Sequence, residues 1–271
     1  MFASSIAGRM DRHSFADQLV AANGGAWPDM EGLIRDLYVT HARPGDTMLD
    51  VGVNHGGHFM QMGEAVGEAG HVIGFEAAPE LARRTMATVE QHCAYLRPRL
   101  TLHQCAVSNE AGEASFYFSK MNDSGLSGLA NRAILASGDV EEIKVEVRTI
   151  DSLVDDYVAA MLCFAKFDIE GAEYHAFLGA EKIFKHHPII TFEWDVSSPR
   201  YFNYKPEDIF NFVTSRGYRI FDLFGFAYDS VAELVDARVW NFVAIPLEMD
   251  PAHILSPSIE TMTTLFPDIF R

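Results

Sequence analysis

Short apolar runs alternate with longer amphipathic stretches along most of the chain beyond residue 46. The short runs are typical of buried strands, and they lie at residues 47–51, 71–76, 100–107, 162–167 and 188–194. The amphipathic stretches are typical of helices, and they lie at residues 59–66, 79–92, 173–185 and 206–216. Repeated strand–helix–strand units predict an α/β fold whose mainly parallel sheet carries helices on both faces.

The two ends of the chain differ from this alternation. Residues 1–45 have a mixed, mildly helical pattern that ends at the Arg-Pro-Gly-Asp breaker of residues 43–46. They predict a helical N-terminal extension in front of one domain at 46–271. Apolar runs at 218–223 and 239–245 predict that the chain closes with two further strands.

The pattern of apolar and polar positions also changes in the middle of the chain. Residues 114–118 and 144–150 show partial alternation of apolar and polar positions, which favours strands. A stretch rich in Ser, Gly and Asn lies between them, at 120–138. The pattern therefore predicts added strands or a hairpin around a loop, inserted near 112–150.

Candidate chemistry begins at the end of the first strand, because ligands of open α/β sheets lie beyond the carboxyl ends of the strands. The glycine-rich turn at 50–57 lets the backbone approach a ligand, and Asp50 can accept a hydrogen bond from an amino group. Glu76, at the end of the second strand, is placed to accept from ribose hydroxyls. Asn54 stands where the dinucleotide fingerprint needs its middle glycine for a pyrophosphate. The turn therefore favours a nucleoside cofactor without phosphates, such as S-adenosylmethionine (SAM), over NAD.

The ends of the third and fourth strands add to this site. Residues 104–108 would lie beside the adenine, although an ordinary buried strand explains them equally well. Asp168, Glu170 and Glu173 place three carboxylates around one glycine turn. Acids also suit the start of a helix, which can account for Glu173 but does not require Asp168 on an otherwise apolar strand.

Seven segments, in order, resemble the FkbM-type methyltransferases, a branch of the Rossmann-like SAM-dependent enzymes. They are LDVGVNHGG (49–57), GFEAAPE (74–80), QCAVSNEAGEASF (104–116), SGLSGL (124–129), VRTIDSL (147–153), KFDIEGAEYHAFLGAE (166–181) and ITFEWD (190–195). The ordered set covers roughly residues 45 to 195, and DIEGAE is its most specific part. The resemblance implies a seven-stranded sheet with an antiparallel last strand, and O-methylation of hydroxyls on sugars, polyketides or similar metabolites. It also implies that SAM is held by Asp50, Gly52, Asn54 and Glu76, and we add Gly56, Ala77, Ala106 and Asp168 to this expected cofactor set.

Methyl transfer to an alcohol needs alignment of the acceptor and a group that takes the hydroxyl proton. The candidates for this base are Asp168, Glu170, Glu193 and His55, with His58 and His175 behind them. Our hypothesis is that Asp168 mainly positions SAM, while Glu170 or Glu193 deprotonates the hydroxyl. Two alternatives stay open: Mg²⁺ held by Asp168 with Glu193 or Asp195, and a SAM-binding protein without catalysis. We expect no metal, because the resemblance implies none.

Two departures from the family pattern bear on the acceptor. His55 occupies a position where the family more often has a small or neutral residue. The region after residue 195 follows no family pattern and is rich in aromatic residues, namely Tyr201, Phe202, Tyr204, Phe221, Phe224, Phe226 and Tyr228. These rings suit either a lid over the acceptor or core filling, and core filling is slightly favoured.

Composition narrows the class of partner. The 271 residues are 48% hydrophobic, which allows a large core, and carry a formal net charge of −17. That charge argues against nucleic acid and anionic membranes as partners, so we expect a small-molecule or carbohydrate acceptor. The three cysteines show no metal-binding or disulfide pattern, and the sequence has neither a signal-like stretch nor a bilayer-spanning run. We therefore expect a cytoplasmic protein, and the sequence does not indicate its oligomeric state.

Overall fold

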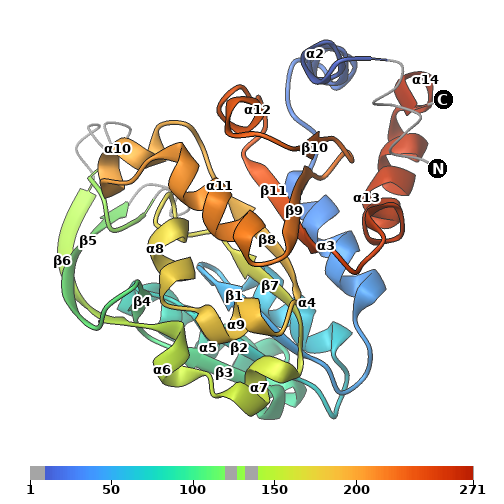
Figure 1. Cartoon of the computed structure of the whole chain (residues 1–271). Coiled ribbons are helices and arrows are strands. Elements are labelled where there is room, and N and C mark those ends of the chain that lie inside the picture. The colour runs from blue at the N-terminus through green and yellow to red at the C-terminus, as the bar shows by residue number, and fades with distance from the viewer. Residues whose placement is uncertain (1–9, 120–126, 132–139, 271) are drawn as a thin grey trace.

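The described part of the computed structural model, residues 10–119, 127–131 and 140–270, is built around an eight-stranded sheet (Figure 1). Its strand order is β10-β9-β11-β8-β7-β1-β2-β3. The bounds are β1 Thr47–Val51, β2 His71–Phe75, β3 Leu100–His103, β7 Leu162–Phe167, β8 Ile189–Glu193, β9 Tyr218–Asp222, β10 Ala227–Tyr228 and β11 Asn241–Pro246. Strands β3, β2, β1, β7 and β8 pair in parallel, and β11 runs antiparallel to β8 and β9. The predicted Rossmann-like sheet with an antiparallel last strand is confirmed, and the two-residue β10 adds an eighth strand to the seven expected.

Helices lie on both faces of this sheet (Figure 1). The crossover helices are α4 Gly57–Ala65, α5 Pro79–His92, α8 Glu173–Leu178, α9 Glu181–Lys185 and α11 Pro206–Ser215. The single helix expected at 173–185 is thus two helices. The Asp151 carboxylate explains the break, because it accepts hydrogen bonds from the backbone N–H groups of Glu181 (3.0 Å) and Lys182 (3.1 Å) and so caps a new helix start. The shorter helices are η1 Ala94–Arg99, α6 Ile150–Leu153, α7 Asp156–Ala160, α10 Ser198–Phe202 and α12 Val231–Val235.

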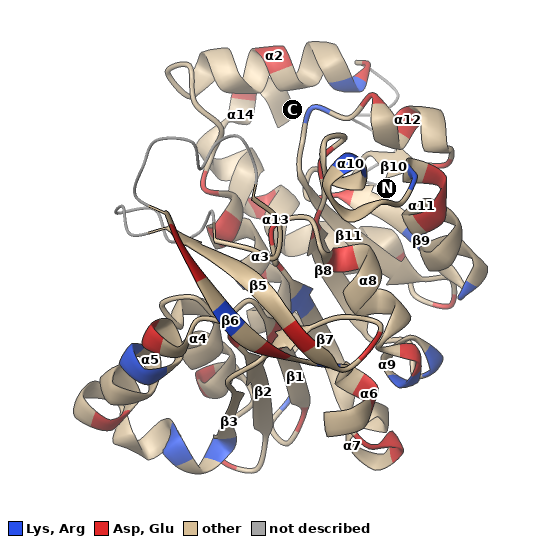
Figure 2. Cartoon of the chain, turned by 90° about the vertical axis from the view of Figure 1, so that its left-hand side faces the viewer, with Lys and Arg blue, Asp and Glu red and all other residues tan. Residues whose placement is uncertain are grey.

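A second, three-stranded sheet crosses in front of the main sheet (Figure 2). It consists of β4 Ala106–Val107, β5 Gly112–Ser119 and β6 Val140–Arg148, with β6 in the middle. The strand expected at 100–107 is therefore divided between the two sheets. Part of the loop expected between β5 and β6 lies outside the described residues, but Gly128 forms an antiparallel bridge with Tyr117 of β5.

Helices from the two ends of the chain pack together. They are α2 Arg12–Ala22 and α3 Met30–His41 at the N-terminal end, and α13 Pro251–Leu265 and α14 Pro267–Phe270 at the C-terminal end. The Thr261 hydroxyl on α13 donates to the Asp36 carboxylate on α3 (2.7 Å). The sequence interpretation ended the chain in strands and missed α13, whose pattern is interrupted by the internal Pro257. Helix α13 matters to the site because it fixes α3.

The aromatic residues after position 195 mostly fill the core. Phe221, Phe224, Phe226 and Tyr228 are each at most 6% exposed. Phe224 and Phe226 pack against α2, where both rings contact Phe15. None of the helices in the described ranges is long and apolar enough to cross a bilayer.

Candidate functional site

Two cavities meet beyond the carboxyl ends of β1 and β7. The first is lined mainly by apolar residues and by carboxylates: Glu31, Val51, Gly52, Asn54, Phe75, Glu76, Ala77, Leu81, Cys105, Ala106, Val107, Phe116, Ser127, Leu129, Asp168, Ile169, Glu170, Ala172, Glu193 and Trp240. The second is lined mainly by polar residues: Asp29, Glu31, Gly32, Arg35, Asp50, Gly52, Val53, Asn54, His55, Gly57, His58, Gln61, Lys166 and Asp168. Four residues line both cavities, and they define the junction between the two: Glu31, Gly52, Asn54 and Asp168.

The glycine turn after β1 is shaped by close backbone approaches. Gly52 has φ +93°, and a Cβ built there would lie 1.8 Å from the carbonyl oxygen of Asp168. The turn after β1 and the end of β7 therefore touch, which only glycine at position 52 allows. Gly56 has φ +80° and would place a Cβ 2.5 Å from Thr85. Gly56 lines neither cavity, so packing against Thr85 explains it here, and its expected cofactor contact stays a prediction.

Asp50 carries a buried carboxylate next to the second cavity. Its side chain is 1% exposed, and within the described residues neither of its oxygens has a hydrogen-bond partner. Burial raises the pKa of Asp50 to about 6, against the opposing charges of Lys166 and His58. A buried carboxylate without donors is costly unless a ligand supplies them. Asp50 is thus suited to accept hydrogen bonds from a cationic group in the second cavity.

Glu76 connects the turns after β1 and β2. Its Oε2 accepts a hydrogen bond from the backbone N–H of Asn54 (2.7 Å), and its Oε1 accepts one from that of Ala78 (2.8 Å). Burial raises the pKa of Glu76 to about 7. Glu76 and Ala77 both line the first cavity, as does Ala106 on β4. The residues expected around the ribose and the adenine are therefore brought together.

Lys166 and Asp168 form an ion pair at the end of β7, with Lys166 buried and Asp168 partly buried. Lys166 is 4% exposed, and its ammonium donates to Asp168 Oδ2 at 2.7 Å. Burial alone would raise the pKa of Asp168, but the Lys166 charge and a hydrogen bond from Glu193 hold it below its ordinary value. Asp168 is therefore ionised in the folded protein.

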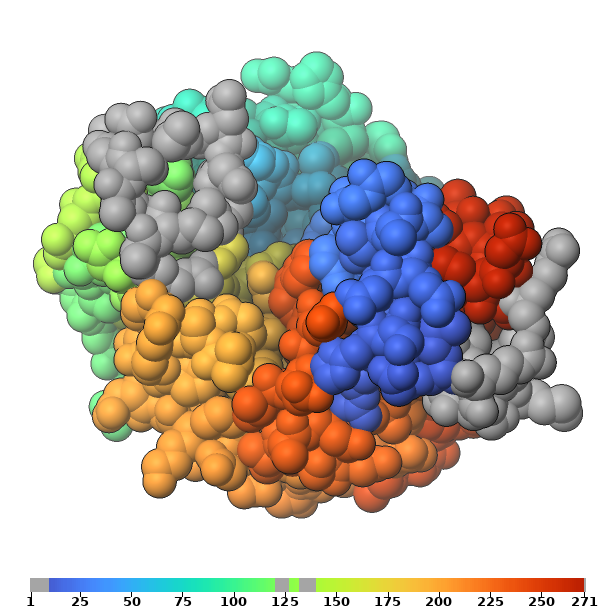
Figure 3. All heavy atoms as spheres, turned by 90° about the horizontal axis from the view of Figure 1, so that it is seen from above, coloured from blue at the N-terminus to red at the C-terminus, as the bar shows by residue number. Residues whose placement is uncertain are grey.

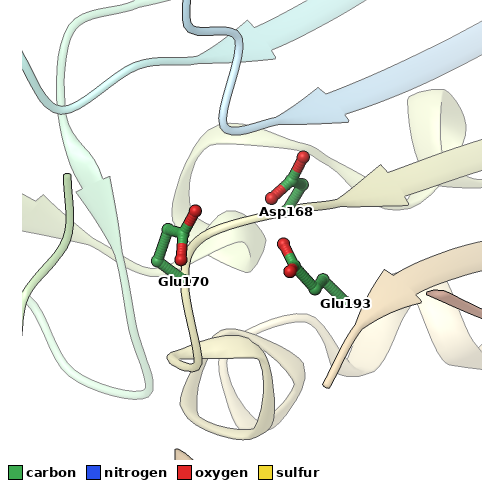
Figure 4. A group of neighbouring side chains, drawn as sticks. All are labelled: Asp168, Glu170 and Glu193. Carbon is green, nitrogen blue, oxygen red and sulfur yellow. The ribbon is translucent and has the colours of Figure 1, made fainter. Parts of the chain in front are cut away.

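Asp168, Glu170 and Glu193 all line the first cavity, and their side chains lie close together (Figure 4). One oxygen from each carboxyl group lies within 4.8 Å of the other two. Burial and the negative charge of Asp168 raise the pKa of Glu193. Two adjacent carboxylates cannot both ionise cheaply, so Glu193 carries the proton of the Asp168–Glu193 pair. We call these three residues the carboxylate trio.

Glu173 holds the turn that carries Glu170. Glu170 and Gly171 have positive φ values of 61° and 102°. Glu173 is fully buried, and its Oε1 accepts hydrogen bonds from the backbone N–H groups of Ile169 (2.9 Å) and Gly171 (3.3 Å). Glu173 is thus a structural acid within the DIEGAE segment, and Asp168 and Glu170 are the two that reach the cavity.

Glu173 should make the protein less stable as the pH rises. Burial raises its pKa from 4.5 to about 8, so between about pH 4.5 and 8 the folded state keeps a proton that the unfolded state has lost. The free energy of unfolding should therefore fall across this window. Glu173→Gln keeps an acceptor oxygen but cannot titrate, so between about pH 6 and pH 7 it should reduce this fall by about 1.4 kcal/mol. Urea unfolding at both pH values measures the change.

The exposed Glu68 supplies the control for that measurement. Glu68→Gln removes the same charge and should leave the pH dependence of the wild type unchanged. Equal pH dependence in Glu173→Gln and the wild type would show that Glu173 does not hold a proton in the folded state.

The other predicted site residues lie apart from the carboxylate trio. His55 is exposed and lines the second cavity only, while His58 pairs with Glu31 (2.7 Å). His175 packs against Phe202 and lines neither cavity. Asp195, considered above as a metal ligand, instead accepts hydrogen bonds from Ser197 and Ser198 and is not part of the trio.

The cavity-lining residues that sequence reasoning missed include four with polar or aromatic side chains, namely Glu31, Arg35, Lys166 and Trp240. Lys166 could have been found, because its two-residue spacing from Asp168 along a strand places both on one side. Trp240 precedes β11, and Glu31 and Arg35 lie on α3, so only the tertiary fold brings them to the site.

Residues 50–220, most of the chain, match the family model of the methyltransferase FkbM domain. No curated protein matched the sequence. Solved structures with similarity include a candidate rRNA methylase from Clostridium thermocellum, at 14% identity and a TM-score of 0.47, covering 81% of this chain and 95% of the other. A SAM-dependent O-methyltransferase from Thermotoga maritima has 12% identity and a TM-score of 0.42, covering 83% and 68%. A SAM-dependent methyltransferase from Aquifex aeolicus has 12% identity and a TM-score of 0.40, covering 87% and 97%.

Proposed function

The chain belongs to the FkbM methyltransferase family and is a SAM-dependent methyltransferase, and we propose that it methylates a hydroxyl oxygen of a small molecule such as a sugar or a polyketide-like metabolite. The observation that carries this proposal is that the three neighbouring carboxyl groups of the carboxylate trio all line the first cavity. A hydroxyl must lose its proton as the new bond forms, and a carboxylate in hydrogen-bond reach can take it.

The residues of the two cavities fit SAM. SAM, when bound, would supply the methyl group of its sulfonium, and the electrons of the broken carbon–sulfur bond would stay on the sulfur. The apolar wall of the first cavity suits an adenine, and Glu76 suits the ribose hydroxyls. The donor-free oxygens of Asp50 suit the α-ammonium group of the methionine part in the second cavity. The fit therefore supports a cofactor that spans both cavities.

Glu76→Ala should weaken SAM binding at least about tenfold, because charge-assisted hydrogen bonds contribute about 1.5–3 kcal/mol each. Calorimetric titration measures the affinity. Glu76 also accepts hydrogen bonds from the backbone N–H groups of Asn54 and Ala78, so Glu76→Gln serves as the matched variant. It should lose less SAM affinity than Glu76→Ala. An affinity for SAM equal to that of the wild type in Glu76→Ala would remove the ribose assignment.

The chain's own residues supply alignment and proton transfer. Holding an acceptor behind the methyl carbon can lower the barrier by about 7–11 kcal/mol. Within the trio, Glu193 already carries a proton and Asp168 is paired with Lys166. Glu170 lines the first cavity next to this pair, and we take it as the base. In this assignment Asp168 positions the cofactor, and Glu193 keeps the proton of the Asp168–Glu193 pair.

Product analysis tests the proposal directly. The full chain is incubated with SAM carrying a labelled methyl group and a panel of sugars, polyketide-like alcohols and amines. We expect label on a hydroxyl oxygen, located by NMR. Label on nitrogen or carbon would overturn the O-methylation proposal, and absence of methyl loss from SAM with every acceptor would favour a non-catalytic SAM-binding protein.

A metal-assisted reaction is the second candidate, because the carboxylate trio has the oxygen ligands that Mg²⁺ prefers. We expect turnover to be unchanged by EDTA and not raised by added Mg²⁺, since alignment and a protein base suffice. Steady-state rates with and without chelator measure this. Loss of activity in EDTA that Mg²⁺ restores would make Asp168, Glu170 and Glu193 metal ligands instead.

A further inference from the structure

Trp240 brings an aromatic side chain to the first cavity from the antiparallel part of the main sheet. It directly precedes β11, and its carbonyl oxygen accepts a hydrogen bond from the backbone N–H of Trp194 (2.8 Å). The next residue, Asn241, pairs with Glu193 at the end of β8. Because β11 runs antiparallel to β8, its start lies at the same edge of the sheet as the carboxyl end of β8. Trp240 therefore lines the cavity near Glu193, one member of the carboxylate trio.

Strand order separates Trp240 from the residues expected around the nucleoside. Glu76 and Ala77 follow β2, and the strands β1, β7 and β8 lie between β2 and β11. The carboxylate trio follows or ends β7 and β8, so it lies between the nucleoside residues and Trp240. An acceptor whose reacting hydroxyl lies at the trio can therefore extend toward Trp240 without meeting the cofactor. Trp240 also lies outside residues 50–220, the segment that matches the family model.

The indole of Trp240 is held in place by the N-terminal extension. Trp27, three residues before α3, packs against it with ring centroids 5.7 Å apart and ring planes at 85°. Figure 3 shows the N-terminal segment, in blue, lying against residues of the C-terminal part, in orange and red. Trp240 is only partly buried, whereas Trp194 is 2% exposed. The ring of Trp240 is thus fixed, with part of its surface open to the cavity.

The first cavity is acidic. Its lining includes five carboxyl side chains, and none of the described residues that line it is basic: the acids are Glu31, Glu76, Asp168, Glu170 and Glu193. Lys166 lines the second cavity, and its ammonium pairs with Asp168. A phosphate or carboxylate group of an acceptor would therefore meet negative charge without a compensating cation. Carboxyl oxygens instead suit a molecule with several hydroxyl donors.

We propose that Trp240 selects the acceptor by packing its indole against one face of an uncharged ring that carries several hydroxyl groups, as in a neutral glycoside. This inference rests on the O-methylation of a hydroxyl proposed above. The C–H groups on the face of such a ring give the indole an apolar surface to cover, while the hydroxyls donate to the carboxyl oxygens nearby. Trp240 is thus a specificity-determining residue that takes no part in the chemical step.

Ligand-observed NMR titration of the full chain, saturated with the product S-adenosylhomocysteine, tests this without turnover. The probes are the methyl glycosides of common hexoses, glucose 6-phosphate and glucuronic acid as anionic counterparts, and catechol as a flat aromatic alcohol. We expect the wild type to bind a neutral glycoside more tightly than either anionic sugar or catechol. Trp240→Ala should weaken binding of that glycoside about tenfold, the size expected when the apolar contact with one ring face is lost.

Two further variants and one further measurement separate acceptor recognition from a loss of fold. Trp240→Phe keeps a flat ring and should weaken glycoside binding only about threefold. Tyr157→Ala removes a ring that is 77% exposed and lines neither cavity, so it should leave glycoside binding unchanged. Calorimetric affinities for S-adenosylhomocysteine should stay within about twofold of the wild type in all three variants, because Trp240 lies away from the nucleoside residues.

Three outcomes would overturn the inference. Tighter binding of catechol or an anionic sugar than of every neutral glycoside, or no glycoside binding at all, would contradict the acceptor class. Equal glycoside affinity in Trp240→Ala and the wild type would remove Trp240 from the acceptor site. An equal loss of S-adenosylhomocysteine affinity in Trp240→Ala would mean that Trp240 serves the cofactor or the fold.

Failure of the proposed function has a different signature from failure of this inference. In that case the labelled methyl group of SAM would appear on nitrogen or carbon, or on no acceptor, whatever the glycoside affinities of the Trp240 variants.

Discussion

Glu170→Gln should lower kcat by about 10²–10⁴-fold while the affinity for SAM stays near that of the wild type. Glu170 lines the first cavity beside a carboxyl pair that already holds one proton. Glutamine keeps the size and the hydrogen-bonding oxygen of the side chain but cannot take a proton from the acceptor. The loss should therefore fall on the chemical step. Rates at saturating SAM and acceptor, with calorimetric SAM affinities, measure both quantities.

Glu193→Gln is the matched control for this experiment. Because Glu193 is protonated in the folded protein, glutamine imitates its state, and the rate should fall much less than in Glu170→Gln. A larger loss of rate in Glu193→Gln would mean that Glu193 is the base and Glu170 is not. Full turnover in both variants would contradict both assignments, and the base would then be a histidine such as His55, or the reaction would need no protein base.

Strands β1 and β7 could be predicted closely because each is a short, mostly apolar run that is almost entirely buried, and both have the bounds that the pattern indicates. The strand expected at 100–107 was harder to predict, because an apolar pattern alone does not show which sheet a residue joins. Ala106 in fact pairs with Val147 in the second sheet. The break in the helix at 173–185 depends on Asp151, a residue more than twenty positions earlier, so no local pattern reveals it.

The site could be predicted as far as it follows from strand ends. Carboxyl ends of neighbouring parallel strands meet at one edge, which is why Asp50, Glu76, Asp168 and Glu193 gather as expected. Their protonation could not be predicted, because it depends on the distances between Lys166, Asp168 and Glu193. Glu31 could not be predicted either, since it reaches the cavity only through the packing of α3 against α13.

Removal of Lys166 should have the largest effect on stability. Its ammonium is buried beside Asp168 and near Asp50, and removing one partner of a buried ion pair costs about 3–5 kcal/mol because it leaves uncompensated charge. Lys166→Met should therefore lower the free energy of unfolding by about this amount in urea. Asp168→Asn should destabilise less, because Asp50 still faces the ammonium, but it should weaken SAM binding as well as the rate.

The double variant Lys166→Met/Asp168→Asn distinguishes a paired charge from two independent residues. If the ion pair accounts for the loss, removal of the second partner eliminates the uncompensated carboxylate, so the double variant should be more stable than Lys166→Met alone. Its SAM affinity should remain as low as that of Asp168→Asn, since the cofactor contact is still missing. Additive losses of stability would contradict the pairing. A normal SAM affinity in Asp168→Asn would remove Asp168 from the cofactor site and leave it only the structural role of neutralising Lys166.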